Sequence, residues 1–183
     1  MLAPSDVALS STGAKAWILD PIGKKIFAAQ LESSTLSLLC SNNTQTGVDG
    51  YRWSSPRNFA YRPGAGLFVS DYADHALYSV ATSSGSRALE LSMNAGSGPA
   101  WSAPNELAID GPRDVGFVSC GANDAVYAVS LLNGERSLLS GNGAGSGLAL
   151  LSLVAVAVLN SNTLIAVDTG AGQPRVFKVT RGG

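Results

Sequence analysis

The chain has 183 residues, of which 12 are basic and 13 are acidic, so its formal net charge is −1 and only 14% of its residues are charged. A balance this close to zero excludes the basic field with which a general nucleic-acid binder displaces counterions from phosphates. It also excludes an acidic, disordered chain. The length allows one domain with a real core, and a single domain over residues 1–183 is predicted.

The sequence predicts neither a secretion signal nor a membrane span. The opening segment MLAPSDVALS has no basic stretch followed by an apolar one, which a signal peptide requires, and the localisation stays open. The most apolar run, residues 148–159, is too short to cross a bilayer. Cys40 and Cys120 form no CxxC pair, so a structural zinc site is not expected, while a single disulfide between them stays open.

One thirteen-residue segment occurs twice. FVSDYADHALYSV, residues 68–80, returns without a gap as FVSCGANDAVYAV, residues 117–129, at an offset of 49 residues. At the same offset GSRALELS matches GERSLLSG. Weaker copies occupy residues 4–31 and 153–179. A fixed period of this length indicates one structural unit that is repeated along the chain.

Each copy consists of short apolar runs, taken in chain order, that are separated by turn residues. In the second copy the runs are NFAY, GLFVSD, ALYSV and RALELS. They have no helical period, so they are predicted to be strands, and Pro63-Gly64 and Ser84-Gly85 provide the turn chemistry of hairpins. A four-stranded antiparallel meander repeated every 48 to 52 residues predicts an all-β fold of β-propeller blades. The predicted blades are residues 4–55, 56–103, 104–152 and 153–183, the last of them incomplete with three strands.

The repeated unit also resembles a known family. The pattern lfVsD, alysV, sGsR, GsGp and PnelaiD, which extends over nearly the whole chain, resembles the blade of NHL-type propellers. It is similar to bacterial proteins of the gluconolactonase and senescence-marker-like group, which are often exported. The resemblance is specific for architecture. It implies a choice of functions, because such blades serve lactonases, lyases, signalling modules and scaffolds.

A carboxylate marks the end of the second strand in three copies, at Asp20, Asp71 and Asp168, and Cys120 takes its place in the third copy. We expect these carboxylates to lie near one rim and to accept backbone N–H groups of their own turns. Cys120 fits this structural role, because Gly121 can supply the turn without a carboxylate.

An aromatic residue recurs in the third strand. Tyr78 and Tyr127 occupy the same point, as do Phe27 and Phe177. Such a repeated aromatic is expected to be buried between blades.

The gluconolactonase resemblance implies a divalent cation at the mouth of a central channel, held by side chains of the innermost strands. The matching positions here are Asp6, Asn58, and Asn105 or Glu106. Their oxygens suit calcium or another divalent cation, although Glu106 stands where the family has a glycine. The alternative, which we favour, is that these polar residues solvate the channel.

A second candidate site lies in DGYRWSSPRNFAYRPG, where Arg52, Trp53 and Arg57 are close together. Aromatic rings beside arginines can stack on a ligand, so these residues and Trp101 form a candidate surface for a ligand or partner. However, Trp101 repeats Trp53 one blade later, which favours packing between blades.

No catalytic residue is assigned. His75 is the only histidine, and the repeats place Asp124 and Lys24 at its position, so it fits a variable turn and not a nucleophilic mechanism. The predicted function is a non-enzymatic binding or interaction scaffold with no cofactor. The alternative is a lactonase-type hydrolase that depends on a divalent metal.

Self-association through the terminal blades is also predicted, and the alternatives that stay open are a fragment of a longer propeller and a closed four-bladed ring. The last copy ends with a strand at residues 175–180, and an open strand edge can pair with another chain. Ile165, Val167 and Val176 are expected to expose apolar surface on this blade, which favours contacts through residues 154–183.

Overall fold

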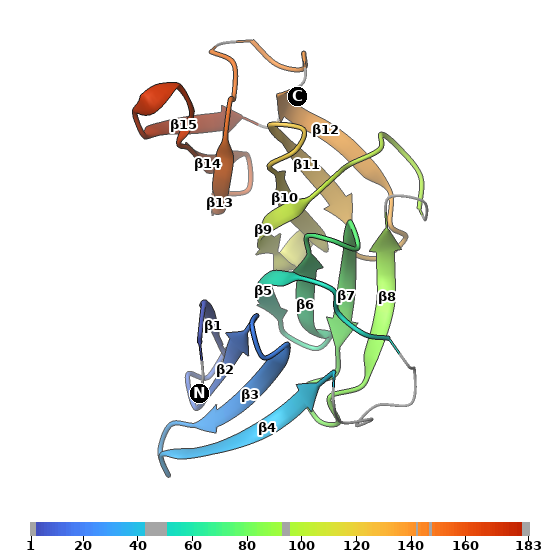
Figure 1. Ribbon diagram of the computed structural model, residues 1–183, viewed down its shortest axis with the longest axis vertical. Helices are drawn as coiled ribbons and strands as arrows, with labels where there is room; N and C mark the ends of the chain where they lie inside the picture. The colour runs from blue at the N-terminus through green and yellow to red at the C-terminus, as the bar shows by residue number, and fades with distance from the viewer. Residues whose placement is uncertain (1–2, 43–50, 93–95, 142, 147, 181–183) are drawn as a thin grey trace. The chain divides into compact units, whose positions relative to one another are not determined.

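The computed structural model describes residues 3–42, 51–92, 96–141, 143–146 and 148–180 (Figure 1). The chain divides into two compact units, residues 1–90 and 91–183. Each unit is described by itself. No helix among the described residues is long and apolar enough to cross a membrane.

The described residues form four antiparallel sheets, each a meander in which strands neighbour one another in chain order. The first three sheets have four strands, and the fourth has three within the described part of the chain. This arrangement confirms the predicted all-β fold of blade-like meanders, the last of them incomplete. The strands of the first two sheets are β1 (Asp6–Leu9), β2 (Lys15–Asp20), β3 (Lys25–Gln30), β4 (Thr35–Ser41), β5 (Pro56–Arg62), β6 (Gly66–Asp71), β7 (Ala76–Val80) and β8 (Arg87–Ser92). Those of the third and fourth are β9 (Pro104–Asp110), β10 (Val115–Cys120), β11 (Ala125–Ser130), β12 (Arg136–Gly141), β13 (Leu153–Asn160), β14 (Thr163–Asp168) and β15 (Arg175–Thr180).

The repeat register is visible in the strand pairing. In each sheet the second strand pairs with the third. The residue two positions before the end of the second strand lies opposite the recurrent aromatic residue: Val69 opposite Tyr78, and Val118 opposite Tyr127. Tyr78 and Tyr127 are buried, as the sequence predicts. The equivalent pairs in the first and fourth sheets are Ile18 with Phe27 and Ala166 with Phe177, whose aromatic rings are half-buried.

Side chains alternate between the two faces of each sheet. We call the face that carries Ile18 and Phe27, and its equivalents in the other sheets, the leading face. The opposite face, which carries Trp17 and Ile26 and their equivalents, is the trailing face. In each unit the core forms where a trailing face meets a leading face.

The core of the first unit joins the trailing face of the first sheet to the leading face of the second. Trp17 and Ile26 pack in one cluster with Val69 and Tyr78, and Trp53 lies in the same cluster. Each such side chain contributes about 1.5–3 kcal/mol when it is fully buried. The two sheets therefore stabilise one another.

The core of the second unit repeats this packing. Phe117 and Val126, on the trailing face of the third sheet, cluster with Leu164, Ala166 and Val179 on the leading face of the fourth. The same face-to-face relation thus holds both sheet pairs together.

Candidate functional site

The Asp71 carboxylate sits at the end of β6 and is fully buried. Its Oδ1 atom accepts the backbone N–H groups of Ser55 at 2.9 Å, Asp74 at 3.0 Å and Ala73 at 3.1 Å, and its Oδ2 atom accepts that of Ser54 at 2.9 Å. Burial raises the pKa of Asp71, and these hydrogen bonds oppose the rise. One carboxylate thus joins the turn into β7 to the segment that precedes β5.

Asp168 and Asp20 occupy the same position in their sheets. Asp168 accepts the N–H groups of Leu151 and Gly170, each at 2.6 Å, and a bond from Arg175 Nη2 at 3.1 Å. Burial raises the pKa of Asp168, but the two backbone bonds and the Arg175 guanidinium outweigh burial, so the pKa lies below its ordinary value. Asp20 accepts the Gly23 N–H at 2.8 Å.

The third sheet reaches the same geometry without a carboxylate. Gly121, which follows Cys120, donates its N–H to the Ala103 carbonyl at 3.2 Å. The matching bond in the second sheet runs from Tyr72 to Ser55 at 2.9 Å. A backbone hydrogen bond therefore joins the end of the second strand to the segment before the first strand in both sheets. The carboxylates add further bonds to this connection.

Asp6, the first candidate metal ligand, is engaged with the backbone. Asp6 Oδ2 accepts the Phe59 N–H at 2.9 Å, and Oδ1 accepts the Val7 N–H at 2.8 Å. Burial raises the pKa of Asp6, and these two bonds oppose the rise. Within the first unit the structure therefore places Asp6 beside β5, the strand that carries the buried Asn58.

The other two candidates lie on β9 in the second unit. A Cβ atom built on Gly121 would lie 2.7 Å from Nδ2 of Asn105, so this amide packs against the turn after β10. The Glu106 N–H donates to the Ser119 hydroxyl at 3.1 Å. Among the residues that the structure describes, no group of three or more His, Cys, Asp or Glu side chains is arranged to hold a metal ion.

Trp53 and Trp101 are each only 1% exposed, a burial that fits packing between blades better than a ligand surface. Trp53 lies in the core of the first unit, and the Trp101 ring packs edge-on against the Tyr127 ring at 6.3 Å between centroids. Arg57 and Arg52 are exposed, and Arg57 lies over the Tyr72 ring at 4.9 Å from its centroid. These two arginines remain a candidate partner surface.

Two arginines that sequence reasoning did not single out cover the tryptophans. The Arg87 guanidinium lies 5.0 Å from the Trp53 ring centroid, and its Nη1 donates to Asn42 Oδ1 at 3.0 Å. Arg136 lies 5.5 Å from the Trp101 centroid. The signal was present in the repeat, because GSR and GER align at the start of the fourth strand.

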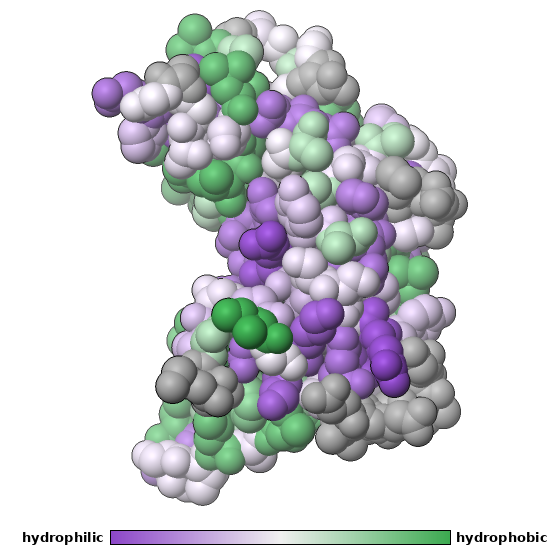
Figure 2. Space-filling view, viewed as in Figure 1, coloured by the Kyte–Doolittle hydropathy of each residue, from purple (hydrophilic) through white to green (hydrophobic). Residues whose placement is uncertain are grey.

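Within the first unit, the leading face of the first sheet is the face that lies away from the core. One cross-strand row on it consists of Val7, Ile18, Phe27 and Leu38. Val7 is 61% exposed and Leu38 43%. Figure 2 shows hydrophobic residues on the visible surface of this sheet.

Within the second unit, the trailing face of the fourth sheet likewise lies away from the core. Its central row consists of Ala155, Val167 and Val176, and Ile165 lies in the next row. Val176 is 70% exposed, while Ile165 and Val167 are half-buried. The fourth sheet thus exposes less apolar surface here than the sequence predicts.

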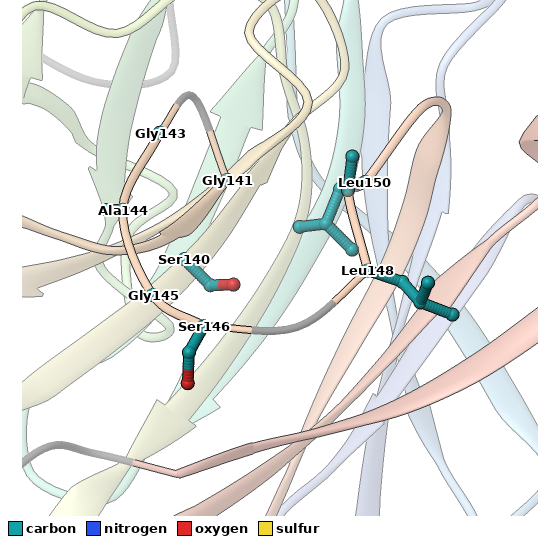
Figure 3. Close-up of a pocket in the computed structure, with 9 residues that line it drawn as sticks. Ser140, Gly141, Gly143, Ala144, Gly145, Ser146, Leu148 and Leu150 are labelled. Atoms are coloured by element: carbon teal, nitrogen blue, oxygen red, sulfur yellow. The ribbon is translucent and has the colours of Figure 1, made fainter.

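A groove lies in the second unit between β12 and β15. It has a volume of about 600 Å³ and is lined by residues 137–140 of β12, by residues 177–180 of β15, and by parts of the segment that joins their sheets. A smaller pocket of about 200 Å³ adjoins it. In Figure 3 the side chains of Ser140 and Ser146 lie on one side of this pocket and those of Leu148 and Leu150 on the other.

Comparison with known proteins shows the fold alone. No protein-family model matches the chain, and no curated protein matches it. Solved structures do match it. A nidogen/laminin complex superposes with a TM-score of 0.72 at 16% identity, over 97% of this chain and 60% of that chain.

Two further structures agree. A protein of unknown function from Bacteroides thetaiotaomicron has a TM-score of 0.73 at 13% identity, over 96% of this chain and 47% of that one. Kuenenia stuttgartiensis hydrazine synthase has a TM-score of 0.72 at 14% identity, over 97% and 46%. The chain is built of β-propeller blades. It spans between 46% and 60% of the length of these structures.

Proposed function

We propose that the protein is a non-enzymatic β-propeller scaffold that binds further copies of itself through its first and fourth sheets. The observation that carries this proposal is the open leading face of the first sheet. The same face is covered by a trailing face in both the second and the fourth sheet. The repeat therefore indicates that a trailing face would also fit the leading face of the first sheet.

The open leading face has the composition of a blade interface. Besides Val7 and Leu38, it exposes Leu9 and Leu36 in a second cross-strand row. A contiguous apolar patch on a soluble protein marks an interaction surface. Because the patch spans all four strands of the sheet, a flat partner of the same width would cover it best.

The trailing face of the fourth sheet is the matching partner surface. In the first sheet the equivalent face carries Trp17 and Ile26, and it covers the second sheet. We infer that the face with Val176 in one copy covers the face with Leu38 in the next. Such a contact joins two different surfaces, so it produces closed rings or open filaments and not a two-fold dimer.

Two variants test this contact. Leu38→Lys should block the leading face and Val176→Lys the trailing face, because each buries a charge in an apolar contact. Light scattering at micromolar concentration should give an assembly for the unmodified protein and monomers for each variant alone. An equimolar mixture should form a one-to-one dimer, since each variant retains the face that the other lacks.

Ile22→Lys is the matched control. Ile22 is exposed in the turn between β2 and β3 and lies in neither row, so this variant should assemble like the unmodified chain. A monomeric unmodified protein would refute the proposal. Variants that stay monomeric when mixed would show that association uses other surfaces.

The lactonase-type hydrolase is the second candidate, and with it the NHL-type and gluconolactonase-like assignments. What favours it is the Phe59–Asp6 bond, which holds Asp6 beside the strand of Asn58. The fit is poor, because both Asp6 oxygens already accept backbone N–H groups. A cation would have to share these oxygens with the two backbone N–H groups.

A thermal-shift titration with calcium separates the two functions. The scaffold predicts no change in the melting midpoint of the unmodified protein. A midpoint that rises with calcium in the unmodified protein, and does not rise in Asp6→Asn, would favour the metal-dependent hydrolase.

A further inference from the structure

The outer edge of β15 differs from the corresponding edge in the other sheets. In the first three sheets a fourth strand follows the third and pairs with it. In the fourth sheet β15 pairs with β14, and no described strand pairs with its other edge. An unpaired edge presents a row of backbone N–H and C=O groups that can template another strand.

The groove of about 600 Å³ lies along this strand. Its walls combine apolar side chains, such as Phe177, Val179 and Leu150, with the hydroxyl-bearing Ser137 and Ser140. A backbone edge beside a row of pockets is the arrangement by which proteins bind extended peptides. Main-chain bonds then give affinity, and the pockets for alternate side chains give specificity.

In the first and third sheets the fourth strand pairs with the third in the same register. This register shows which residues the free edge of β15 would select. Phe27 pairs with Leu38 in the first sheet, and Tyr127 pairs with Leu138 in the third. Phe177 is the repeat equivalent of these two aromatic residues. A leucine should therefore lie opposite Phe177.

The third sheet also indicates an arginine. Val129 pairs with Arg136, two residues before Leu138, and Val179 is the equivalent of Val129. The second sheet begins its fourth strand with the same pattern, at Arg87 and Leu89. A strand with the sequence Arg-x-Leu would place the arginine opposite Val179 and the leucine opposite Phe177.

We propose that β15 and the groove bind an extended Arg-x-Leu segment from outside the described residues, which pairs antiparallel with β15 as a fourth strand. This contact uses the edge of the sheet and not its faces. It is therefore separate from the face-to-face assembly proposed above, and either can hold without the other.

A fluorescent peptide with the sequence GERSLLSG tests the edge. The sequence is that of residues 134–141, which include the fourth strand of the third sheet. Titration with the Leu38→Lys protein, followed by fluorescence polarisation, should give saturable binding, and this variant is chosen because it is expected to be monomeric. A peptide that carries Asp in place of the leucine opposite Phe177 should bind about tenfold or more weakly, which corresponds to about 1.4 kcal/mol.

A matched pair of protein variants locates the site. Ser137→Tyr places a large side chain in the groove and should weaken binding by a similar factor. Ser33→Tyr makes the same change at an exposed position between β3 and β4 and should leave binding unchanged. Hydrogen exchange of the amides in β15 should slow when the peptide binds.

Three results would overturn the proposal. The first is no saturable binding up to about 100 µM protein, a concentration that detects even weak peptide complexes. The second is equal binding of the two peptides. The third is binding that leaves hydrogen exchange in β15 unchanged.

Discussion

The guanidinium of Arg87 covers the ring of Trp53, 5.0 Å from its centroid. Asn42 links the two residues a second time. Its Oδ1 atom accepts a hydrogen bond from the Arg87 guanidinium at 3.0 Å and another from the backbone N–H of Trp53 at 3.0 Å. The fourth strand of the second sheet is thereby fastened to the segment that enters that sheet. Arg136 repeats the arrangement over Trp101 and donates to the Ser92 carbonyl at 2.6 Å and the Pro99 carbonyl at 3.1 Å.

Arg87→Ala should therefore lower the free energy of unfolding by about 1–2 kcal/mol, the combined scale of a largely desolvated cation–π contact and one hydrogen bond. Arg87→Lys should restore only part of the loss, because an ammonium cannot reproduce the planar guanidinium. Urea denaturation measures both variants. Equal stability of the alanine variant and the unmodified protein would contradict the role given to Arg87.

Tyr127→Ala should cost about 3 kcal/mol, the range of large-to-small changes in a core. The Tyr127 ring is buried, and its hydroxyl donates to the Ala100 carbonyl at 2.9 Å. Tyr127→Phe, which removes only this hydroxyl, should cost about 1 kcal/mol. An alanine variant that loses less than about 1 kcal/mol in urea denaturation would count against the packing of Tyr127.

Asp71→Asn should keep the fold and cost about 1 kcal/mol. The amide keeps one oxygen acceptor, but its NH₂ group cannot accept the N–H groups that the second carboxylate oxygen now binds. Glu32→Gln, which neutralises an exposed carboxylate in the turn before β4, is the control for the loss of charge. If Asp71→Asn abolished self-association without a change in stability, the carboxylate would have a binding role instead.

Asp168 should make the protein less stable in acid. Its pKa is lower in the folded chain than its ordinary value, so its stabilising contribution is complete above the ordinary carboxyl pKa of about 3.9. That contribution is lost as the pH falls from there through the folded pKa. The urea midpoint of Asp168→Asn should therefore change less between pH 6 and pH 3, roughly the range of carboxyl titration. Parallel pH profiles for the two proteins would contradict this prediction.

The cysteines should be unreactive in the folded protein. Cys40 and Cys120 are both free and buried, and burial raises the pKa of their thiols to about 11 and about 12. The reactive thiolate is therefore scarce at neutral pH. A thiol reagent should label neither residue in buffer and both in denaturant, and rapid labelling of the native protein would contradict this burial.

The sequence alone determined the elements and their order. Strand character follows from the period of two and from turn residues, which act over a few neighbouring positions, and the repeat carried this information from one sheet to the next. The burial of Tyr78 and Tyr127 followed in the same way, because a residue that recurs at the same register meets the same surroundings each time.

Only the tertiary structure decided how the polar and aromatic candidates are used. Asp6 accepts the N–H of Phe59, 53 residues away, and Trp53 lies beneath Arg87. These contacts depend on which face of one sheet lies on the next, and a shift of one residue in strand register would reverse the faces. The exposure of Val7 and Leu38 on the leading face is also known only from the tertiary structure, because the sequence does not reveal whether another sheet covers an apolar residue.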